Sequence, residues 1–331
     1  KSSRENSFAR TRRCRIETLE ELVPLTAVPT GTNIQIQTQN QNLDQNNPDV
    51  AKDPVGDFVV VWEQVTSAGN RDIFARQFFA TGTPKGVEFA VATATPDQYS
   101  PRVDMAGDGS FVVVWEEVDT DGDTDIYFRR FNSAGNAISL PTLANPDDLV
   151  NQSDPDIAVF PTGTFVITWT NATTGTNSDI QFRRFVSNGS PLDAAARNLA
   201  NTAQNETQGR IAANKAISAD RFMVVWTEAT TRGDTDVMRD MRSIFTGNTI
   251  SGAGVVSDNA ATQNLNHFNP SVDLDVVGNA VVTYAEEVAL TNNNLYLRRY
   301  NNLGVAQTTD RQVVEDQAAV DTKVSQVGIA G

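Results

Sequence analysis

The sequence predicts an all-β protein, a β-propeller assembled from four-stranded repeats. Three observations lead to this prediction: a unit of about 55 residues recurs five times, each copy contains a short apolar run that ends in an aromatic residue, and turn residues follow these runs at fixed distances. A chain of 331 residues exceeds the usual size of one domain, but a repeat architecture accommodates it as a single unit. We assign residues 1–30 to a basic N-terminal segment and residues 31–331 to the propeller domain.

Aromatic anchors align the five copies. They lie 53, 54, 57 and 58 residues apart, at Trp62, Trp115, Trp169, Trp226 and Tyr284. Ten residues after each anchor stands an aspartate or an asparagine, and in four copies an arginine stands fourteen residues after it. Because these distances are constant, the hairpin between the two strands has a fixed length.

The second copy shows the expected strands one by one. The segment 101–106 alternates apolar and polar side chains, and the glycines at 107 and 109 predict a turn before the apolar run 111–115. So short a valine-rich run is typical of a strand covered on both faces. In the next strand, Ile126, Phe128 and Arg130 share one face, since side chains alternate along a strand.

A second turn at 132–135 leads into a weaker fourth strand, which completes the blade. A β-solenoid is the main alternative architecture. Its coils repeat at roughly 20 to 30 residues, so the longer unit favours propeller blades.

Both ends of the repeat region carry partial copies. Residues 33–38 are similar to a fourth strand, and residues 323–330 are similar to a first strand. Five complete units with two partial terminal strands predict five or six blades. The alternatives are a polypeptide that continues past Gly331, five blades with a reinforced seam, or a sixth blade completed by a second molecule.

Composition excludes several classes of function. The formal net charge of −15 disfavours nucleic acid and anionic lipid as partners. One cysteine, Cys14, permits no internal disulfide, and the lone histidine, His267, rules out multi-histidine metal sites. No apolar run approaches the ~20 residues of a transmembrane helix.

The repeat pattern resembles that of large secreted bacterial surface proteins, including calcium-associated, adhesin-like ones. The resemblance rests on Pro-x-Val, Gly-x-Phe-Val-Val-Val-Trp-Glu, Asp-Ile-x-x-Arg-x-Phe and a following glycine, and it covers residues 33–331. Copies four and five depart from it, at Asp240 and Tyr284. The resemblance implies an exported protein at the cell surface or outside the cell.

The N-terminus resembles the arginine-rich segment near the start of many planctomycete surface and exported proteins. Six basic residues and one acidic residue lie within residues 1–16, and Leu19-Glu20 follows. An amphipathic helix with Ile16, Leu19 and Leu22 on its apolar side is the alternative interpretation.

One loop predicts a calcium site. Its carboxylates alternate at Asp119, Asp121, Asp123 and Asp125, and calcium prefers such oxygen-rich, flexible loops. The alternative is a solvated hairpin tip, because the cluster occurs in one copy only. We expect no other cofactor.

The sequence contains no recognisable grouping of catalytic residues. The recurring aspartates Asp72, Asp125, Asp179 and Asp236 are expected to cap turns, and one arginine of each third-strand pair is expected to contact acidic loops. His267 lies in a loop-like segment without a partner for acid–base chemistry. Adjacent carboxylates such as Glu116 and Glu117 point to opposite faces of a strand. We therefore predict that the chain is not an enzyme.

These observations predict a non-enzymatic, extracellular structural or adhesive repeat protein. Its expected partners are other copies of itself, cell-envelope or matrix proteins, and glycans. The alternative is a propeller that binds a glycan or a small ligand at one end of its channel. A hydrolase is the third hypothesis, and it requires carboxylates from different blades to converge.

Overall fold

The computed structural model describes residues 34–38, 42–66, 69–93, 95, 97–119, 122–145, 150–172, 177–200, 202–216, 218, 220–257, 265–289, 292–309 and 311–314. Every regular element within them is a β-strand, and none is a helix. Accordingly, no helix in this part of the chain could span a membrane. The chain divides into two compact units, Lys1–Gln35 and Ile36–Gly331, and all the strands belong to the second.

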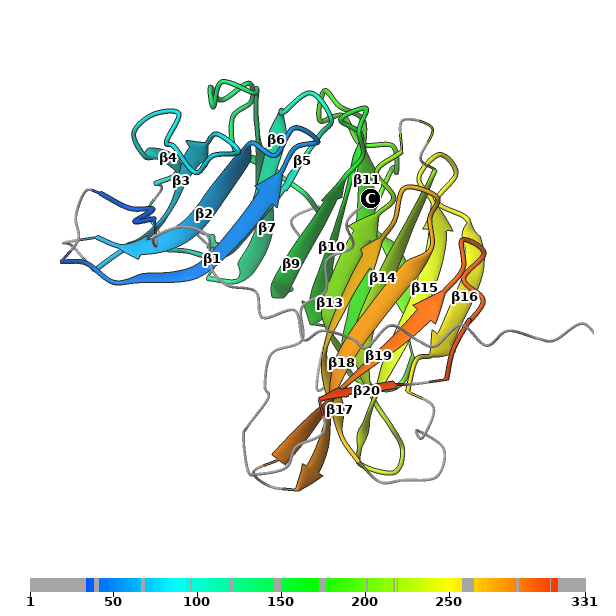
Figure 1. Ribbon diagram of the computed structural model, residues 1–331. Coiled ribbons are helices and arrows are strands. Elements are labelled where there is room, and N and C mark those ends of the chain that lie inside the picture. Colours follow the sequence, from blue (N-terminus) through cyan, green and yellow to red (C-terminus); the bar gives the residue numbers. More distant parts are fainter. Residues whose placement is uncertain are drawn as a thin grey trace, which may run out of the picture. The chain divides into compact units, whose positions relative to one another are not determined.

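Within the described residues, twenty strands form five four-stranded sheets, which we call blades A to E (Figure 1). Blade A contains β1 (Gln45–Lys52), β2 (Phe58–Val65), β3 (Arg71–Phe78) and β4 (Phe89–Ala92). Blade B contains β5 (Gln98–Met105), β6 (Phe111–Val118), β7 (Thr124–Phe131) and β8 (Thr142–Leu143). Blade C contains β9 (Gln152–Val159), β10 (Phe165–Ala172), β11 (Ser178–Phe185) and β12 (Arg197–Ala200). Blade D contains β13 (Glu206–Ala213), β14 (Arg221–Ala229), β15 (Thr235–Ser243) and β16 (Thr249–Val255), and blade E contains β17 (His267–Leu274), β18 (Ala280–Ala289), β19 (Asn292–Tyr300) and β20 (Arg311–Val314).

Each blade is an antiparallel meander whose strands pair in sequence order. The first strands of successive blades contact one another, from β1 through β5, β9 and β13 to β17. They are therefore the innermost strands of the ring, and the fourth strands lie outermost. The predicted propeller fold with five complete four-stranded units is confirmed.

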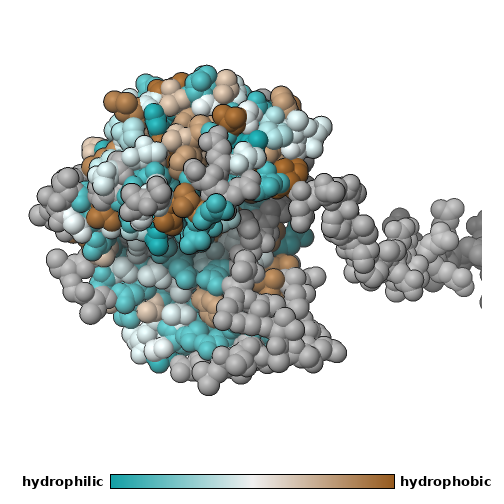
Figure 2. Space-filling model, turned by 90° about the vertical axis from the view of Figure 1, so that its left-hand side faces the viewer, coloured by the Kyte–Doolittle hydropathy of each residue, from teal (hydrophilic) through white to brown (hydrophobic). Residues whose placement is uncertain are grey.

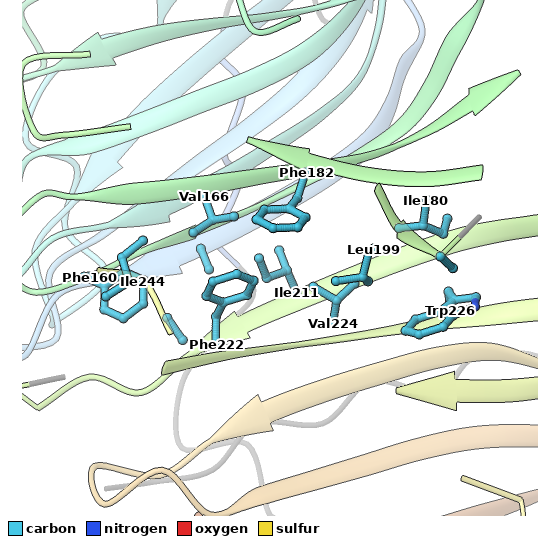
Figure 3. Packing of buried hydrophobic residues seen from close by; sticks show 13 residues of the cluster. Phe160, Val166, Ile180, Phe182, Leu199, Ile211, Phe222, Val224, Trp226 and Ile244 are labelled. Carbon is cyan, nitrogen blue, oxygen red and sulfur yellow. The ribbon is translucent and has the colours of Figure 1, made fainter. Parts of the chain in front are cut away.

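Alternating side chains of the apolar runs form the seams between blades. In the seam between A and B, Val59 and Val61 of β2 pack with Val103 and Trp115 of blade B. The opposite face of blade B contributes Val114, with Ile126 and Phe128 as expected, to the seam with blade C. Figure 3 shows the seam between C and D, where Phe182 of β11 faces Phe222 of β14. This two-sided burial explains why the central strands are continuously apolar.

Exposed apolar side chains remain at scattered positions. In a space-filling view of one side of the molecule, hydrophobic side chains lie as separate spots among hydrophilic ones (Figure 2). Val55, Leu140 and Phe245 are among the most exposed large hydrophobic residues. Such isolated residues are normal on a protein surface.

Glycines close the turns that the sequence predicts. Gly109 (φ +81°) ends the turn between β5 and β6, and its amide donates to Ala106 O at 3.1 Å. Gly135 (φ +80°) closes the turn after β7 by donating to Asn132 O at 2.9 Å. Both need the left-handed conformation that glycine adopts without strain.

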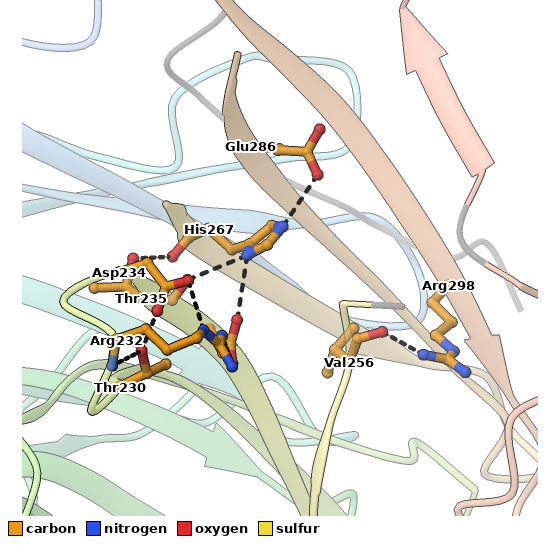
Figure 4. Close-up of polar contacts among 9 residues, drawn as sticks. Thr230, Arg232, Asp234, Thr235, Val256, His267, Glu286 and Arg298 are labelled. Carbon is orange, nitrogen blue, oxygen red and sulfur yellow. Dashed lines mark hydrogen bonds and ion pairs between the residues drawn. The ribbon is translucent and has the colours of Figure 1, made fainter. Parts of the chain in front are cut away.

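The third-strand arginines fasten neighbouring blades together. Arg129 Nη1 donates to Val91 O of the preceding blade at 2.7 Å, and Arg183 Nη1 donates to Ala144 O at 3.1 Å. Arg298 makes the equivalent bond to Val256 O (Figure 4). The partners of these three arginines are main-chain carbonyls at the outer side of the preceding blade, rather than the predicted acidic loops. In the pair Arg183 and Arg184, the second arginine does contact a loop carboxylate, that of Asp193, as predicted.

The equivalent arginine of blade A, Arg76, indicates a further outer segment before that blade. Arg76 Nη1 donates to Ile36 O at 2.6 Å, and donor and acceptor lie 40 residues apart in the sequence. In the equivalent bonds of the other blades this separation is 38, 39 and 42 residues. Thr38 N also donates to Glu88 Oε2 of blade A at 2.8 Å. The segment 36–38 thus occupies the place of a fourth strand, as its sequence predicts.

Candidate functional site

Three layers of side chains from the innermost strands surround the axis of the ring. Residues at alternate positions of β5, Val103 and Met105, are buried in the seam, whereas Ser100, Arg102 and Asp104 are only partly buried. Since side chains alternate along a strand, the second set faces the channel. β9, β13 and β17 repeat this burial pattern.

The first layer is built on a backbone bulge that all five blades share. Its residues have positive φ angles between 48° and 57°, and they are Asn47, Ser100, Asp154, Gln208 and Asn269. The register of the first two strands shifts at each of them, as in a β-bulge. Asparagine and aspartate tolerate this conformation better than serine or glutamine does.

Carboxylate and amide side chains of one blade hold the bulge of the next. Ser100 N donates to Glu63 Oε1 at 2.6 Å, and Asp154 N donates to Glu116 Oε1 at 2.8 Å. Burial raises the pKa of Glu116, and the neighbouring carboxylates Asp154 and Glu63 raise it further. The channel entrance is therefore rich in fixed acidic groups.

The second layer alternates in charge around the channel. It consists of Asp49, Arg102, Asp156, Arg210 and Ser271, one residue from each blade. Asp49 Oδ2 accepts from Val103 N and Asp156 Oδ2 accepts from Ile211 N, both at 2.9 Å. These bonds fix the two carboxyl groups against the inner edge of the following blade.

The two carboxyl groups of this layer have different electrostatic surroundings. Burial raises the pKa of Asp49 to about 6, the charge of Arg102 opposes this rise, and the charge of Asp156 adds to it. Burial also raises the pKa of Asp156, while both Arg210 and Arg102 lower it. The charge of Asp156 in blade C therefore contributes to the raised pKa of Asp49 in blade A.

A cavity of about 610 Å³ lies at the end of the channel where the first strands end. All five blades line it, through Val50, Asp104, Pro161, Lys215 and Asp273 among others. Lys215 Nζ donates to Asp104 Oδ2 at 2.6 Å and to Val159 O at 2.7 Å, which joins blades B, C and D. The cavity combines charged groups with exposed aliphatic side chains, since Val50 is 57% exposed.

A buried ion cluster occupies the seam between blades D and E. His267, which we expected in a loop, is the first residue of β17 and is fully buried. Its Nε2 lies 3.1 Å from Glu286 Oε2, its Nδ1 lies 3.4 Å from Asp236 Oδ1, and Arg232 also contacts Asp236 (Figure 4). Burial lowers the pKa of His267, but the hydrogen bonds to Asp236 and Glu286 outweigh burial and raise it to about 9.

The recurring third-strand aspartates are buried in the blade seams. Asp72 Oδ1 accepts from Asn70 Nδ2 at 2.7 Å, and Asp179 Oδ1 accepts from Asn177 Nδ2 at 3.4 Å. In both bonds the donor is the side-chain amide of the asparagine two residues earlier. Their role in holding the blade together agrees with a structural interpretation.

The predicted calcium ligands are only partly described. Asp119 Oδ1 accepts from Gly122 N at 3.1 Å, while Asp125 is 1% exposed and accepts from Asn145 Nδ2 at 3.4 Å. Asp121 lies outside the described residues. Among the residues that are described, no group of three or more histidine, cysteine, aspartate or glutamate side chains could hold a metal ion. The calcium site stays a prediction.

Sequence reasoning missed the charged layer of the channel. Its five residues occupy one position of the repeat, directly before the valine or isoleucine of each first strand. That position holds aspartate in the first and third copies, arginine in the second and fourth, and serine in the fifth. A search for a conserved catalytic residue therefore finds nothing. Charge alternation at one repeat position is the signal that would have revealed the layer.

Comparison with solved structures shows the same fold in other proteins. An α-L-arabinofuranosidase of Fusarium graminearum, solved with arabinobiose, matches with a TM-score of 0.55 and 11% identity over 85% of each chain. A protein of unknown function from Dyadobacter fermentans matches with a TM-score of 0.54 and 9% identity, also over 85% of each chain. A Hadza microbial sialidase matches with a TM-score of 0.51 and 11% identity over 82% of this chain, which spans 59% of the sialidase. The shared feature is the fold.

Comparison of the sequence with known families and curated proteins identifies no relative. No family model matches the chain, and no curated protein is significantly similar to it. The structural comparison nevertheless contradicts two predictions, a non-enzymatic structural or adhesive role and the absence of enzyme activity. Two of the three structures described above are glycoside hydrolases, so this propeller architecture is one that supports carbohydrate chemistry.

Proposed function

We propose that this protein binds a carbohydrate chain in the channel and hydrolyses a glycosidic bond there. One observation supports the proposal: the channel layer contains two carboxyl groups from different blades, Asp49 and Asp156, and the charge of Asp156 contributes to the raised pKa of Asp49. Hydrolysis of a glycoside needs two carboxyl groups on opposite sides of the scissile bond. Carboxylates on neighbouring residues of one strand do not meet that need, whereas carboxylates from separate blades do.

The surroundings of the two groups affect the protonation of each carboxyl group. The raised pKa of Asp49, about 6, suits a general acid that must be protonated near neutral pH. Burial raises the pKa of Asp156 as well, and the charges of Arg210 and Arg102 oppose that rise. We assign the general acid to Asp49 and propose Asp156 as the second carboxyl group of the pair.

Fixed hydrogen bonds prepare both groups for this chemistry. Val103 N and Ile211 N hold the carboxyl groups at 2.9 Å, so little reorganisation is needed when substrate binds. Arg102 and Arg210 lie in the same layer and supply donors for sugar hydroxyl or carboxylate groups. The adjacent cavity of about 610 Å³ has room for sugar residues on one side of the cleaved bond.

The experiment measures sugar release from arabino-oligosaccharides and sialylated oligosaccharides. We expect Asp49→Asn and Asp156→Asn each to reduce kcat/KM by at least about 100-fold, with circular dichroism unchanged. Asp57→Asn, which alters a carboxylate that pairs with Lys85 and does not line the cavity, is the matched control. Activity that is unchanged in both channel variants would refute the assignment.

Calorimetric titration with the same oligosaccharides separates recognition from catalysis. Binding without hydrolysis would support glycan recognition and overturn the catalytic roles. The wild-type rate should also decline above about pH 6, as Asp49 loses its proton.

We further propose that the protein acts outside the cell and that the loop at Asp119 binds calcium. The extracellular location follows from the resemblance of the repeats to those of secreted bacterial surface proteins. Asp119, Asp121, Asp123 and Asp125 would supply the oxygen ligands. Calcium titration should release heat with the native chain and none with Asp121→Ala.

A further inference from the structure

We propose that a second cavity, between blades B and C, binds the carboxylate of an acidic sugar through Arg130. The choice of a sugar rests on the carbohydrate binding proposed above, whereas the anion site rests on the contacts of Arg130 alone. All the residues that carry the inference belong to the described part of the chain, in contrast to the partial copy at 323–330, which lies outside it.

The second cavity has a volume of about 330 Å³ and lies on the face of the ring that also carries the channel cavity. Its walls come from β7 and from the turns after β5, β7, β9 and β11, and they include Asp108, Arg130, Ser133, Thr162 and Ser187. The two cavities share a border, because the turn after β9 lines the channel cavity through Pro161 and the second cavity through Thr162. A volume of this size suits a single sugar ring.

Arg130 belongs to a set of third-strand side chains that reach the turn of the next blade. Its Nη1 donates to Ser187 O at 2.6 Å. In blade A the same position holds Gln77, whose Nε2 donates to Ser133 O at 3.1 Å. A neutral amide thus makes the same contact between blades, so the positive charge of Arg130 is not required for it.

Blade C shows how a guanidinium at this position is neutralised. Arg184 donates to Asp193 from Nε at 2.9 Å and from Nη2 at 2.6 Å, and Asp193 also accepts from the main-chain N of Arg184. The residue nine positions after Arg130 is Ser139, and its Oγ accepts from Arg130 N at 3.0 Å. Ser139 therefore replaces Asp193 in the main-chain bond but supplies no negative charge.

The guanidinium of Arg130 consequently has no carboxylate partner among the described residues. Within that part of the chain, Nη1 alone of its three nitrogens donates a hydrogen bond, and the buried Nε lacks an acceptor. Burial lowers the pKa of Arg130. A cation that is partly removed from water without a counter-ion is unfavourable, and an anion bound from solution relieves this cost. Arginine suits a carboxylate because its donors form a planar fork.

The other polar groups of the cavity favour a sugar over a simple anion. Asp108 Oδ1 accepts from Ser110 Oγ at 2.6 Å and from Ser110 N at 2.9 Å, and these bonds lower the pKa of Asp108. The ionised carboxylate repels a small anion, but it accepts hydrogen bonds from hydroxyl groups. A uronic acid presents a carboxylate to Arg130 and hydroxyl groups to Asp108. Ile138, which is 50% exposed, adds an apolar wall for the C–H face of the ring.

The second cavity would make the proposed hydrolase selective. Because the two cavities share a border, one saccharide chain can occupy both, with its cleaved bond in the channel and an acidic residue at Arg130. Chains that carry a carboxylate, such as sialylated oligosaccharides, would then be preferred over neutral arabino-oligosaccharides.

Calorimetric titration with glucuronate and glucose tests the site, because these sugars differ at C6, where one has a carboxylate and the other a hydroxymethyl group. We expect the native chain to bind glucuronate at least about tenfold more tightly than glucose or acetate. Arg130→Gln should remove this preference and keep the bond to Ser187 O, as Gln77 does in blade A. Ser139→Asp should also remove it, because the new carboxylate would bind the guanidinium as Asp193 does in blade C.

Ser139→Asn is the matched control, since it has the size of aspartate without the charge, and it should retain the preference for glucuronate. Equal affinities of Ser139→Asp and Ser139→Asn would show that charge at this position does not control binding and would overturn the proposal. An unchanged preference in Arg130→Gln, or no preference in the native chain, would overturn it as well. Equal affinity for acetate and glucuronate would indicate an anion site only and overturn the sugar as its ligand.

The proposed hydrolysis is tested separately from this site. Glucuronate contains no glycosidic bond, so Asp49→Asn should bind it as the native chain does. Binding that depends on Arg130, without hydrolysis of any glycoside, would refute the catalytic roles and leave this site in place. Hydrolysis without binding that depends on Arg130 would refute this site alone.

Discussion

The buried histidine between blades D and E makes folding stability depend on pH in a defined window. The pKa of His267 is about 9 in the folded protein and 6.5 ordinarily. The folded state therefore holds this proton more tightly than the unfolded state. The stabilisation is complete below about pH 6.5 and is lost as the pH rises through about 9.

The size of the effect follows from the shift of the pKa. Each unit corresponds to about 1.4 kcal/mol, so deprotonation of His267 should cost about 3 kcal/mol of the free energy of unfolding. Because the imidazole lies 3.1 Å from Glu286 and is fully buried, solvent screens this interaction little. Most of the loss should fall above pH 7.

Urea unfolding, followed by tryptophan fluorescence at several pH values between about 7 and 9, measures this loss. His267→Gln should be less stable at pH 7, since Asp236 and Glu286 lose a cationic partner, but its stability should change little over this interval. Glu286→Gln should reduce the pH dependence without abolishing it. If His267→Gln and the native chain show the same slope, the assigned pKa of His267 is wrong.

Three further predictions concern stability. Burial raises the pKa of Glu206 to about 7, so the native chain should lose stability as the pH rises from about 4.5 to 7, and Glu206→Gln should remove this loss. If the variant and the native chain show the same change of unfolding free energy with pH in urea, this prediction is wrong. Asp193→Ala should cost about 3–5 kcal/mol in the same assay, since it leaves Arg184 buried without the carboxylate that it contacts at 2.6 Å, and a cost below 1 kcal/mol would show that the pair is solvated. Phe182→Ala should cost about 3–5 kcal/mol through the cavity that it leaves between blades C and D, with Phe79→Ala at an exposed position as the control.

The strands of each blade could be predicted because the interactions that form them join residues close together in the sequence. Valine-rich runs that end at Trp62 or Trp115 alternate between two seams, and glycines such as Gly135 fix the turns between them. These features lie within about 20 residues of each other in every copy. The strand number of each blade and the faces of β7 therefore follow from the sequence.

The channel was not predictable in the same way. Asp49 and Asp156 lie about 107 residues apart, and they come together only because three blades wrap around one axis. His267 likewise gains its partners from two different blades, so its loop-like sequence hid its role. The prediction of a non-enzymatic protein failed for this reason, since it searched for catalytic groups along the chain rather than across the ring.

The carboxylates that bridge successive blades give the repeat a direction. Asp49 caps Val103 N of blade B, Asp104 caps Val159 N of blade C, and Asp156 caps Ile211 N of blade D. Each of these three units thus supplies a cap to its successor. If the chain grew by duplication of one ancestral unit, its copies have since become non-interchangeable: a gene with two units exchanged would encode every strand and still leave an inner edge without its carboxylate.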